Sequence, residues 1–395
     1  MTAPARIALL LTGSLLSGAL FTACSFRMDP VENPVKMPAT WDASGSTTAD
    51  AVPQDWWKRF DSPVLTQLVD EAMAGNPGVS IAQERVRQAE RALGVARDDL
   101  LPDLSVNGST SRTRTSISGA PDSTRSTTSV TGQLRYDVDL WGGRTASLRA
   151  SKASLTGTRY DLDTARLTLT ANVATQYFQL LSIRARVAIA RDNLAVAERL
   201  LRIVDARYRN GVARQLDLTQ QTTSVLQQRT NLIPLEAQMR QTETALGLLL
   251  GRVPQGFKVE GEPFERIAIP SVQPWLPSEL LLRRPDIAAA ETDLSAAHAN
   301  IAVARANLLP GAISLTASGN RVSPELLSLA DATSTLSLGG ALSIVESVFT
   351  FRARNAQLAN ARSSEFITLQ NYASSIRTAL KNVDDSLANA QTNQR

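Results

Sequence analysis

The chain has 395 residues, of which 43% are apolar and 20% charged, and its formal net charge is +4. This balance excludes a disordered acidic chain and a low-complexity fibre. One Cys and one His exclude an internal disulfide and most metal sites, since zinc takes three or four Cys or His ligands, and the basic residues are too scattered for a nucleic-acid patch.

The first residues are typical of an export signal. Arg6 precedes the apolar or small residues 7–21, a run that is too short to span a bilayer. The stretch LFTAC at 20–24 resembles a lipobox, which predicts cleavage before Cys24 and lipidation of that residue. In lipoproteins of this kind Asp after the cysteine favours the inner membrane, so Ser25 indicates the outer membrane. An ordinary signal peptide with a chance cysteine stays open as an alternative.

Two regions alternate between apolar and polar residues. From 129 to 140 the even positions are apolar, aromatic or Gly and the odd positions are polar, and a similar alternation returns at 335–345. Weaker alternation at 103–108 and 313–318 precedes each. A period of two predicts strands of about ten residues, with turns near 116–125 and 320–332.

Such strands are typical of a transmembrane barrel, with apolar residues outward and polar residues toward a lumen. A soluble hairpin with one solvated face fits the same pattern. Four strands cannot close a barrel, because the smallest have about eight. Membrane-spanning strands would therefore have to be shared between several protomers.

A long helical hairpin is predicted after Arg144. Its apolar positions recur every seven residues with one four-residue step, at Leu155, Leu162, Leu169, Val173, Leu180, Val187, Leu194, Leu201 and Tyr208. The return segment repeats the spacing at Leu218, Val225, Leu232, Met239 and Leu246. Gly211 is expected to make the turn, and Pro234 to kink the return helix. A helix of about 65 residues would be about 100 Å long, which suits a spacer better than a compact globule.

The chain contains an internal repeat. Residues 92–102 (ALGVARDDLLP) and 300–310 (NIAVARANLLP) agree at six of eleven positions, at an offset of 208. In each copy a helical segment, a strand region and a long helix follow one another. One offset held across both strand regions indicates duplication.

Several phrases point to one family. They are DWWKRF at 55–60, YDVDLWG at 136–142, ATQYF at 174–178, YRNGVA at 208–213, LLLG at 248–251 and LPSELLLRRPDI at 276–287. With the lipoprotein signal and the repeat, they resemble the TolC-like outer-membrane efflux family, in its lipidated branch that serves resistance-nodulation-division (RND) pumps. The resemblance covers the chain from about residue 20 to its end.

The resemblance implies a mainly α fold with a small β part. Long antiparallel α-hairpins would form a periplasmic helical barrel, and four transmembrane strands per protomer would contribute to a shared trimeric β-barrel. The implied partners are two more copies of the chain, a periplasmic adaptor (membrane fusion) protein, an inner-membrane RND pump and outer-membrane lipid. It implies no enzyme activity and no cofactor or metal, only a passive, gated conduit for drugs or other small molecules.

The expected domains are a signal peptide at 1–23, a lipidated extended segment at 24–60, a first repeat at 61–270 and a second repeat at 271–395. The second repeat is expected to be truncated before its hairpin tip, because the offset would place that tip near residue 419 and leave roughly 65 residues missing. A truncated member of the family, or a fragmentary gene model, is the hypothesis that follows.

The resemblance assigns roles to few residues. Cys24 would be the lipid anchor. Gly211, Val212 and Ala213, with Leu216, would be the adaptor-docking tip, since small apolar residues can interlock with another hairpin. Arg207, Tyr208 and Arg209 are candidates for a periplasmic gate, although a solvated, charged helix end explains them equally. His298 is interpreted as an ordinary helix residue, and Pro285 as a helix start.

Two other classes compete with the channel. A periplasmic adaptor or scaffold lipoprotein would also carry α-hairpins, but usually has one hairpin and soluble β domains instead of two repeats with amphipathic strands. An enzyme is disfavoured, because no combination of nucleophile and base, and no metal set, is visible.

Overall fold

The computed structural model describes residues 35, 36, 38, 55–119, 121–270, 283–309, 312–325, 327–329, 332–343 and 348–393. The predicted signal peptide, Cys24 and residues 276–282 lie outside the described residues. The chain divides into two compact units, neither of which is one continuous stretch. Of the described residues, those within 35–36, 87–158 and 287–379 form the first unit, and those within 38–86, 159–286 and 380–393 form the second.

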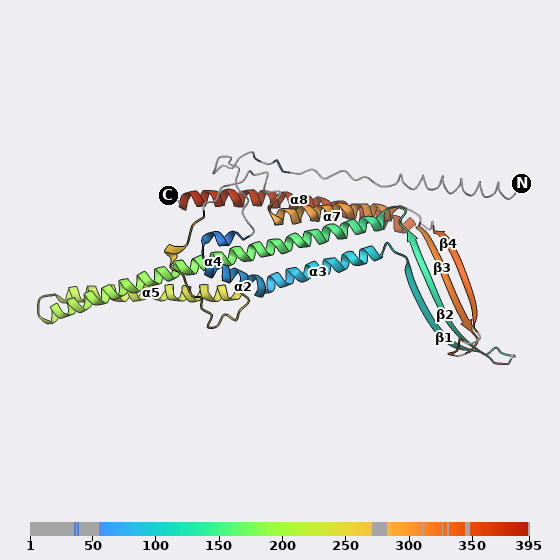
Figure 1. The fold of residues 1–395 in the computed structure, drawn as a ribbon, viewed down its shortest axis with the longest axis horizontal. Coiled ribbons are helices and arrows are strands. Elements are labelled where there is room, and N and C mark those ends of the chain that lie inside the picture. Colours follow the sequence, from blue (N-terminus) through green and yellow to red (C-terminus); the bar gives the residue numbers. More distant parts are fainter. Residues whose placement is uncertain are drawn as a thin grey trace. The chain divides into compact units, whose positions relative to one another are not determined.

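The expected fold class is confirmed: the described chain is mainly helical, with one four-stranded antiparallel sheet (Figure 1). In chain order the elements are η2 (Trp56–Phe60), α2 (Pro63–Gly75), α3 (Pro77–Asp98), β1 (Asp103–Thr115), β2 (Ser123–Val138), α4 (Gly143–Arg209), α5 (Gln215–Leu249), η3 (Phe264–Arg266), α7 (Pro285–Leu308), β3 (Ala312–Ser323), β4 (Thr333–Ser343) and α8 (Val348–Asn393). The order helix, two strands, long helix occurs twice, and β1 and β3 end at Thr115 and Ser323, which are 208 residues apart. The domain boundaries at 61–270 and 271–395 stay a prediction.

The second unit has an apolar core where α2, α4 and α5 meet. Ser62 caps α2 by accepting a hydrogen bond from the backbone N–H of Leu65 at 3.0 Å, and Pro63 occupies the first helical position. The fully buried core residues are Leu65, Val69, Ala72, Val173, Tyr177, Leu180 and Leu246. Two of the family phrases meet at this core, because the rings of Phe60 and Phe178 lie 4.8 Å apart.

In the hairpin, side chains at the predicted heptad positions are buried near the core and become exposed toward the turn. On α4, Val173 and Leu180 are fully buried and Val187 is 2% exposed, whereas Tyr208 at the end of the helix is 38% exposed. The predicted helix is confirmed, since α4 runs for 67 residues, and α5 continues through Pro234 as one helix. Heptad packing therefore holds the hairpin, and the apolar positions become exposed toward the turn.

The LLLG phrase ends α5 with a close approach of two backbones. Gly251 has φ of +73°, and a β-carbon there would lie 2.2 Å from the carbonyl oxygen of Gly75. The Asn76 side chain, next to Gly75, donates to the Leu249 carbonyl at 2.8 Å. Only glycine fits this contact without displacing the end of α2.

The sheet of the first unit has the strand order β1-β2-β3-β4, with every pair antiparallel. Leu104 faces Leu134, which faces Ala317, which in turn faces Leu338. Because side chains alternate along a strand and directly paired residues share a face, this register gathers most apolar residues of the four strands, with Val322 as an exception, on one face. We call it the apolar face, and the opposite one, which carries Ser105, Gln133 and Ser314, the polar face.

The strands are longer than the sequence predicts. β2 begins at Ser123 instead of near residue 129, so the first turn is shorter than the expected 116–125. Residues 123–129 are all Ser, Thr or Arg and show no alternation, yet their backbone pairs with β1 from Thr115 to Ser109. None of the described helices carries an apolar run long enough to cross a bilayer.

We expect Gly251→Ala to lower the stability of the protein more than Gly256→Ala. Both glycines have positive φ, but a β-carbon at Gly256 would meet nothing within 4 Å, so the matched control carries only the backbone cost of about 1–2 kcal/mol. Thermal unfolding of the purified variants measures the difference. Equal melting temperatures for the two would show that the contact with Gly75 is not tight.

Candidate functional site

The turn between α4 and α5 is built on Gly211, as predicted. Gly211 has φ of +74°, and its N–H donates to the Tyr208 carbonyl at 3.0 Å. The N–H of Val212 donates to the Arg207 carbonyl at 2.8 Å. This pair of bonds is a Schellman motif, which satisfies the last carbonyls of α4 and turns the chain out of the helix.

The start of α5 is capped from within the helix. The backbone N–H of Arg214 donates to the Asp217 carboxylate at 2.9 Å. This is one of the two hydrogen bonds of a capping box; the other needs an acceptor side chain at the N-cap, which arginine lacks. Apolar side chains are exposed here: Val212 in the turn is 77% exposed, and Leu216, the second residue of α5, is 56% exposed. Hydrogen bonds thus define the backbone of the tip, and its apolar side chains are exposed beside the charged side chains of Arg209 and Arg214.

The three gate candidates lie on the last turn of α4, and all are exposed. Arg209 forms an ion pair with Asp205 at 2.7 Å. The Arg207 carbonyl takes part in the turn, while its side chain lines a shallow groove of about 480 Å³ with Arg199, Arg202, Ile203 and Val212. The candidates for gate and docking tip thus lie on one short surface.

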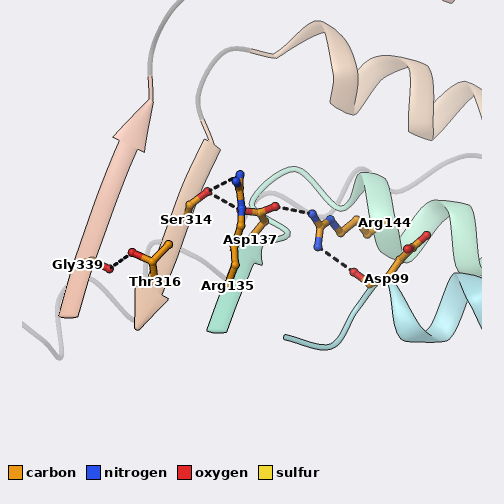
Figure 2. A network of polar contacts seen from close by, with 7 residues as sticks. All are labelled: Asp99, Arg135, Asp137, Arg144, Ser314, Thr316 and Gly339. Atoms are coloured by element: carbon orange, nitrogen blue, oxygen red, sulfur yellow. Dashed lines mark hydrogen bonds and ion pairs between the residues drawn. The ribbon is translucent and has the colours of Figure 1, made fainter. Parts of the chain in front are cut away.

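A polar network at the base of the sheet was not predicted. Asp137, on the polar face of β2, accepts hydrogen bonds from Arg135 at 3.1 Å, from Arg144 at 2.9 Å and from the Ser314 hydroxyl (Figure 2). Arg144 also donates to the backbone carbonyl of Asp99 at 2.8 Å. Arg144 of α4 thus connects β2 with the end of α3, and Asp137 in turn connects β2 with β3.

Asp139 caps α4 beside this network. Its carboxylate accepts from the backbone N–H of Arg144 at 3.1 Å, and from both the N–H and the hydroxyl of Thr145 at 2.8 Å. Burial alone would raise the pKa of Asp139, but the hydrogen bonds from Thr145, Arg144 and Gly143 outweigh burial and hold that pKa below its ordinary value. A carboxylate at a helix N-terminus is also favoured by the helix dipole.

The network borders an open cavity of about 1160 Å³ within the first unit. Its lining includes five acidic and three basic residues, namely Asp98, Asp99, Asp103, Asp137, Asp139, Arg135, Arg144 and Arg354. The sequence signal for this site is the YDVDLWG phrase followed by Arg144. The two acids of that phrase, Asp137 and Asp139, were assigned only to the polar side of a strand.

The remaining predicted residues fall in different places. His298 lies on α7 as expected, half-buried, and its Nδ1 contacts the Glu365 carboxylate of α8, a partner that the sequence did not suggest. Pro285 begins α7, as predicted. In the part of the chain that the structure describes, no group of three or more His, Cys, Asp or Glu side chains could hold a metal ion.

Comparison with known proteins decides between the candidate classes. Residues 68–252 and 276–395 match the model of the family of outer membrane efflux proteins. The chain belongs to this family. The pyoverdine export outer membrane protein OpmQ of Pseudomonas putida is 36% identical over 98% of this chain and 82% of its own length. OpmQ of Pseudomonas aeruginosa is 35% identical over 78% of this chain and 68% of its own length.

Solved structures have the same fold. The outer-membrane channel OprN superposes with a TM-score of 0.81 at 25% identity, over 93% of this chain and 83% of its own. The CmeC outer membrane channel of Campylobacter jejuni gives a TM-score of 0.82 at 22% identity, over 93% and 80%. This outer membrane efflux protein is thus a channel component of an efflux system in the outer membrane, with a periplasmic helical part.

We expect Asp139→Asn to make the stability of this outer membrane efflux protein less dependent on acid pH. Because the pKa of Asp139 is lowered by folding, its contribution is complete above the unfolded pKa of about 3.9 and is lost as the pH falls through the folded value. Melting temperatures of the wild type and the variant, measured from pH 6 to pH 2, should converge at the acid end.

Asp98→Asn is the control, since Asp98 lines the same cavity but its carboxylate makes no recorded hydrogen bond among the described residues. If the melting temperatures of the wild type and of Asp139→Asn differ by the same amount from pH 6 to pH 2, the lowered pKa of Asp139 does not contribute to stability.

Proposed function

We propose that the chain works as a passive conduit, assembled from three copies, in a tripartite efflux system driven by an inner-membrane RND pump. The observation that carries this proposal is the sheet, whose four strands share one apolar face. A sheet with one apolar and one polar face suits a wall between lipid and a watery lumen.

The edges of the sheet support assembly from several copies. β1 and β4 each pair on one side only, so each presents unpaired backbone groups along its outer edge. Such edges cannot stay unpaired in a bilayer, where each unsatisfied group costs several kcal/mol. Three copies joined edge to edge would give a closed sheet of twelve strands, four from each protomer.

The tip between α4 and α5 is the docking surface for a periplasmic adaptor protein in this proposal. Gly211 fixes the turn, while Val212, Ala213 and Leu216 present small apolar groups to another hairpin. Arg207, Tyr208 and Arg209, one turn away, would contribute to closing the periplasmic entrance.

Cys24 is the lipid anchor in this proposal, on the strength of the lipobox-like sequence around it. The protein catalyses no reaction, and the pump supplies the energy for transport. The two OpmQ relatives, at 35% and 36% identity, are named for pyoverdine export. We therefore propose a siderophore of that class as the first substrate to test.

We expect Leu216→Asp to abolish export while trimers still form, because a buried carboxylate would disrupt an apolar docking surface. Leu226→Asp is the matched control, since Leu216 and Leu226 are both 56% exposed on α5. Export is measured as the minimum inhibitory concentration of pump substrates in a strain without its own outer-membrane factor, and assembly as trimer bands from outer-membrane fractions. Equal activity of the two variants would rule out this tip as a docking surface.

We also expect the chain, expressed with its own adaptor and pump, to restore secretion of pyoverdine to a strain that lacks its exporter. Secreted and periplasmic pyoverdine are measured by fluorescence. If drug resistance recovers but pyoverdine stays in the periplasm, the conduit is supported and the siderophore is not its substrate.

A further inference from the structure

The charged residues of the apolar face are all arginines. Among the described strand residues, this face carries Arg112 and Arg114 on β1 and Arg321 on β3, and no acidic residue. The polar face carries charges of both signs, at Asp103, Arg125, Arg135 and Asp137. Only the apolar face therefore has charged residues that are all positive.

These arginines lie at one end of the apolar band or beyond it. On β2 the band runs from Val138 to Val130, which is roughly 27 Å along the strand. Val130 pairs directly with Arg321, so Arg321 marks the end of the band. Arg112 pairs with Ser126, about 13 Å further along the strand toward the hairpin turn.

Two of the three arginines have no recorded carboxylate partner. Arg114 is bound by Asp122 in the turn between β1 and β2, with an N–O distance of 2.6 Å. Arg112 and Arg321 are exposed, and among the described residues no ion pair or side-chain hydrogen bond is recorded for either. A guanidinium group presents a planar fork of donors that matches a phosphate group.

We propose that Arg112 and Arg321 bind the phosphate groups of lipid headgroups in the outer leaflet of the outer membrane. The inference rests on the proposed function, in which the apolar face contacts lipid. Because α3 and α4 adjoin the other ends of β1 and β2 and the helices are periplasmic, the hairpin turn between these strands lies on the side away from the periplasm. An arginine at the bilayer midplane would cost about 2–4 kcal/mol, whereas near the interface the cost falls to about 0–1 kcal/mol. Both arginines lie where that cost is small and where headgroup phosphates are found.

Binding is tested with purified full-length trimers of the wild type, Arg112→Gln, Arg321→Gln and Arg125→Gln. Arg125 is the matched control, because it lies near the same end of the sheet but on the polar face, opposite Thr113. Each trimer is titrated with lipid A, with dephosphorylated lipid A and with inorganic phosphate, and the shift of the melting temperature reports binding.

We expect the apparent affinity for lipid A to fall about tenfold in Arg112→Gln and in Arg321→Gln, as for the loss of a charged hydrogen bond. Arg125→Gln should bind like the wild type. The wild type should bind dephosphorylated lipid A at least as weakly as each single variant binds lipid A, because dephosphorylation removes the partners of both arginines. If either Gln variant fails to fold, its Lys counterpart keeps the charge and should lose affinity by a smaller factor.

Three outcomes would overturn the proposal. Unchanged affinity for lipid A in Arg112→Gln and Arg321→Gln would show that these arginines do not bind it. An equal loss of affinity in Arg125→Gln would show that only the net charge of the protein matters. Inorganic phosphate that binds as tightly as lipid A would indicate a free-anion site. Failure of the proposed function is a different result, namely a wild-type chain that does not reach the outer membrane as a trimer.

Discussion

The pairing register of the four strands is the constraint on which the rest of the structure depends. The leucines and most other large apolar residues occupy even positions in β1, β2 and β4, whereas Ile313, Leu315 and Ala317 occupy odd positions in β3. The pairing matches them: even-numbered Leu134 of β2 pairs with odd-numbered Ala317 of β3, which pairs with even-numbered Leu338 of β4. A slip of one residue in either pairing would turn a whole strand over and place its leucines on the polar face.

The same register explains why the polar network exists. Ser314 and Asp137 are 177 positions apart in the chain, yet the pairing of β2 with β3 sets them directly opposite each other on the polar face. Asp137 then receives Arg144, the second residue of α4, whose backbone N–H is held by Asp139. The side chains that fix the sheet thus also fix the start of the longest helix.

Local patterns in the sequence predicted most elements because those elements are governed by local rules. Heptads predicted α4 and α5, alternation predicted four strands, and glycine at Gly211 predicted the turn. The first residues of β2 were missed, because Ser, Thr and Arg in succession give no periodic signal. The contacts between Asp137 and Ser314, and between His298 and Glu365, were also missed, since a partner far away in the chain is set by register and packing. The roles of Cys24 and of the tip residues stay predictions.

If the apolar face contacts lipid, the environment of the side chains must alternate along β2 in the outer membrane. Single cysteines are introduced on the apolar face, at Val130, Gly132, Leu134 and Tyr136, and on the polar face, at Thr131, Gln133 and Arg135. The unmodified chain is the control for labelling of its one native cysteine. Cells are labelled with a water-soluble maleimide, and extracted membranes with a lipid-soluble one. The register predicts that even positions react only with the lipid-soluble reagent and odd positions with the water-soluble one. Uniform labelling along the strand, or the reverse alternation, would contradict the assignment of the apolar face to lipid.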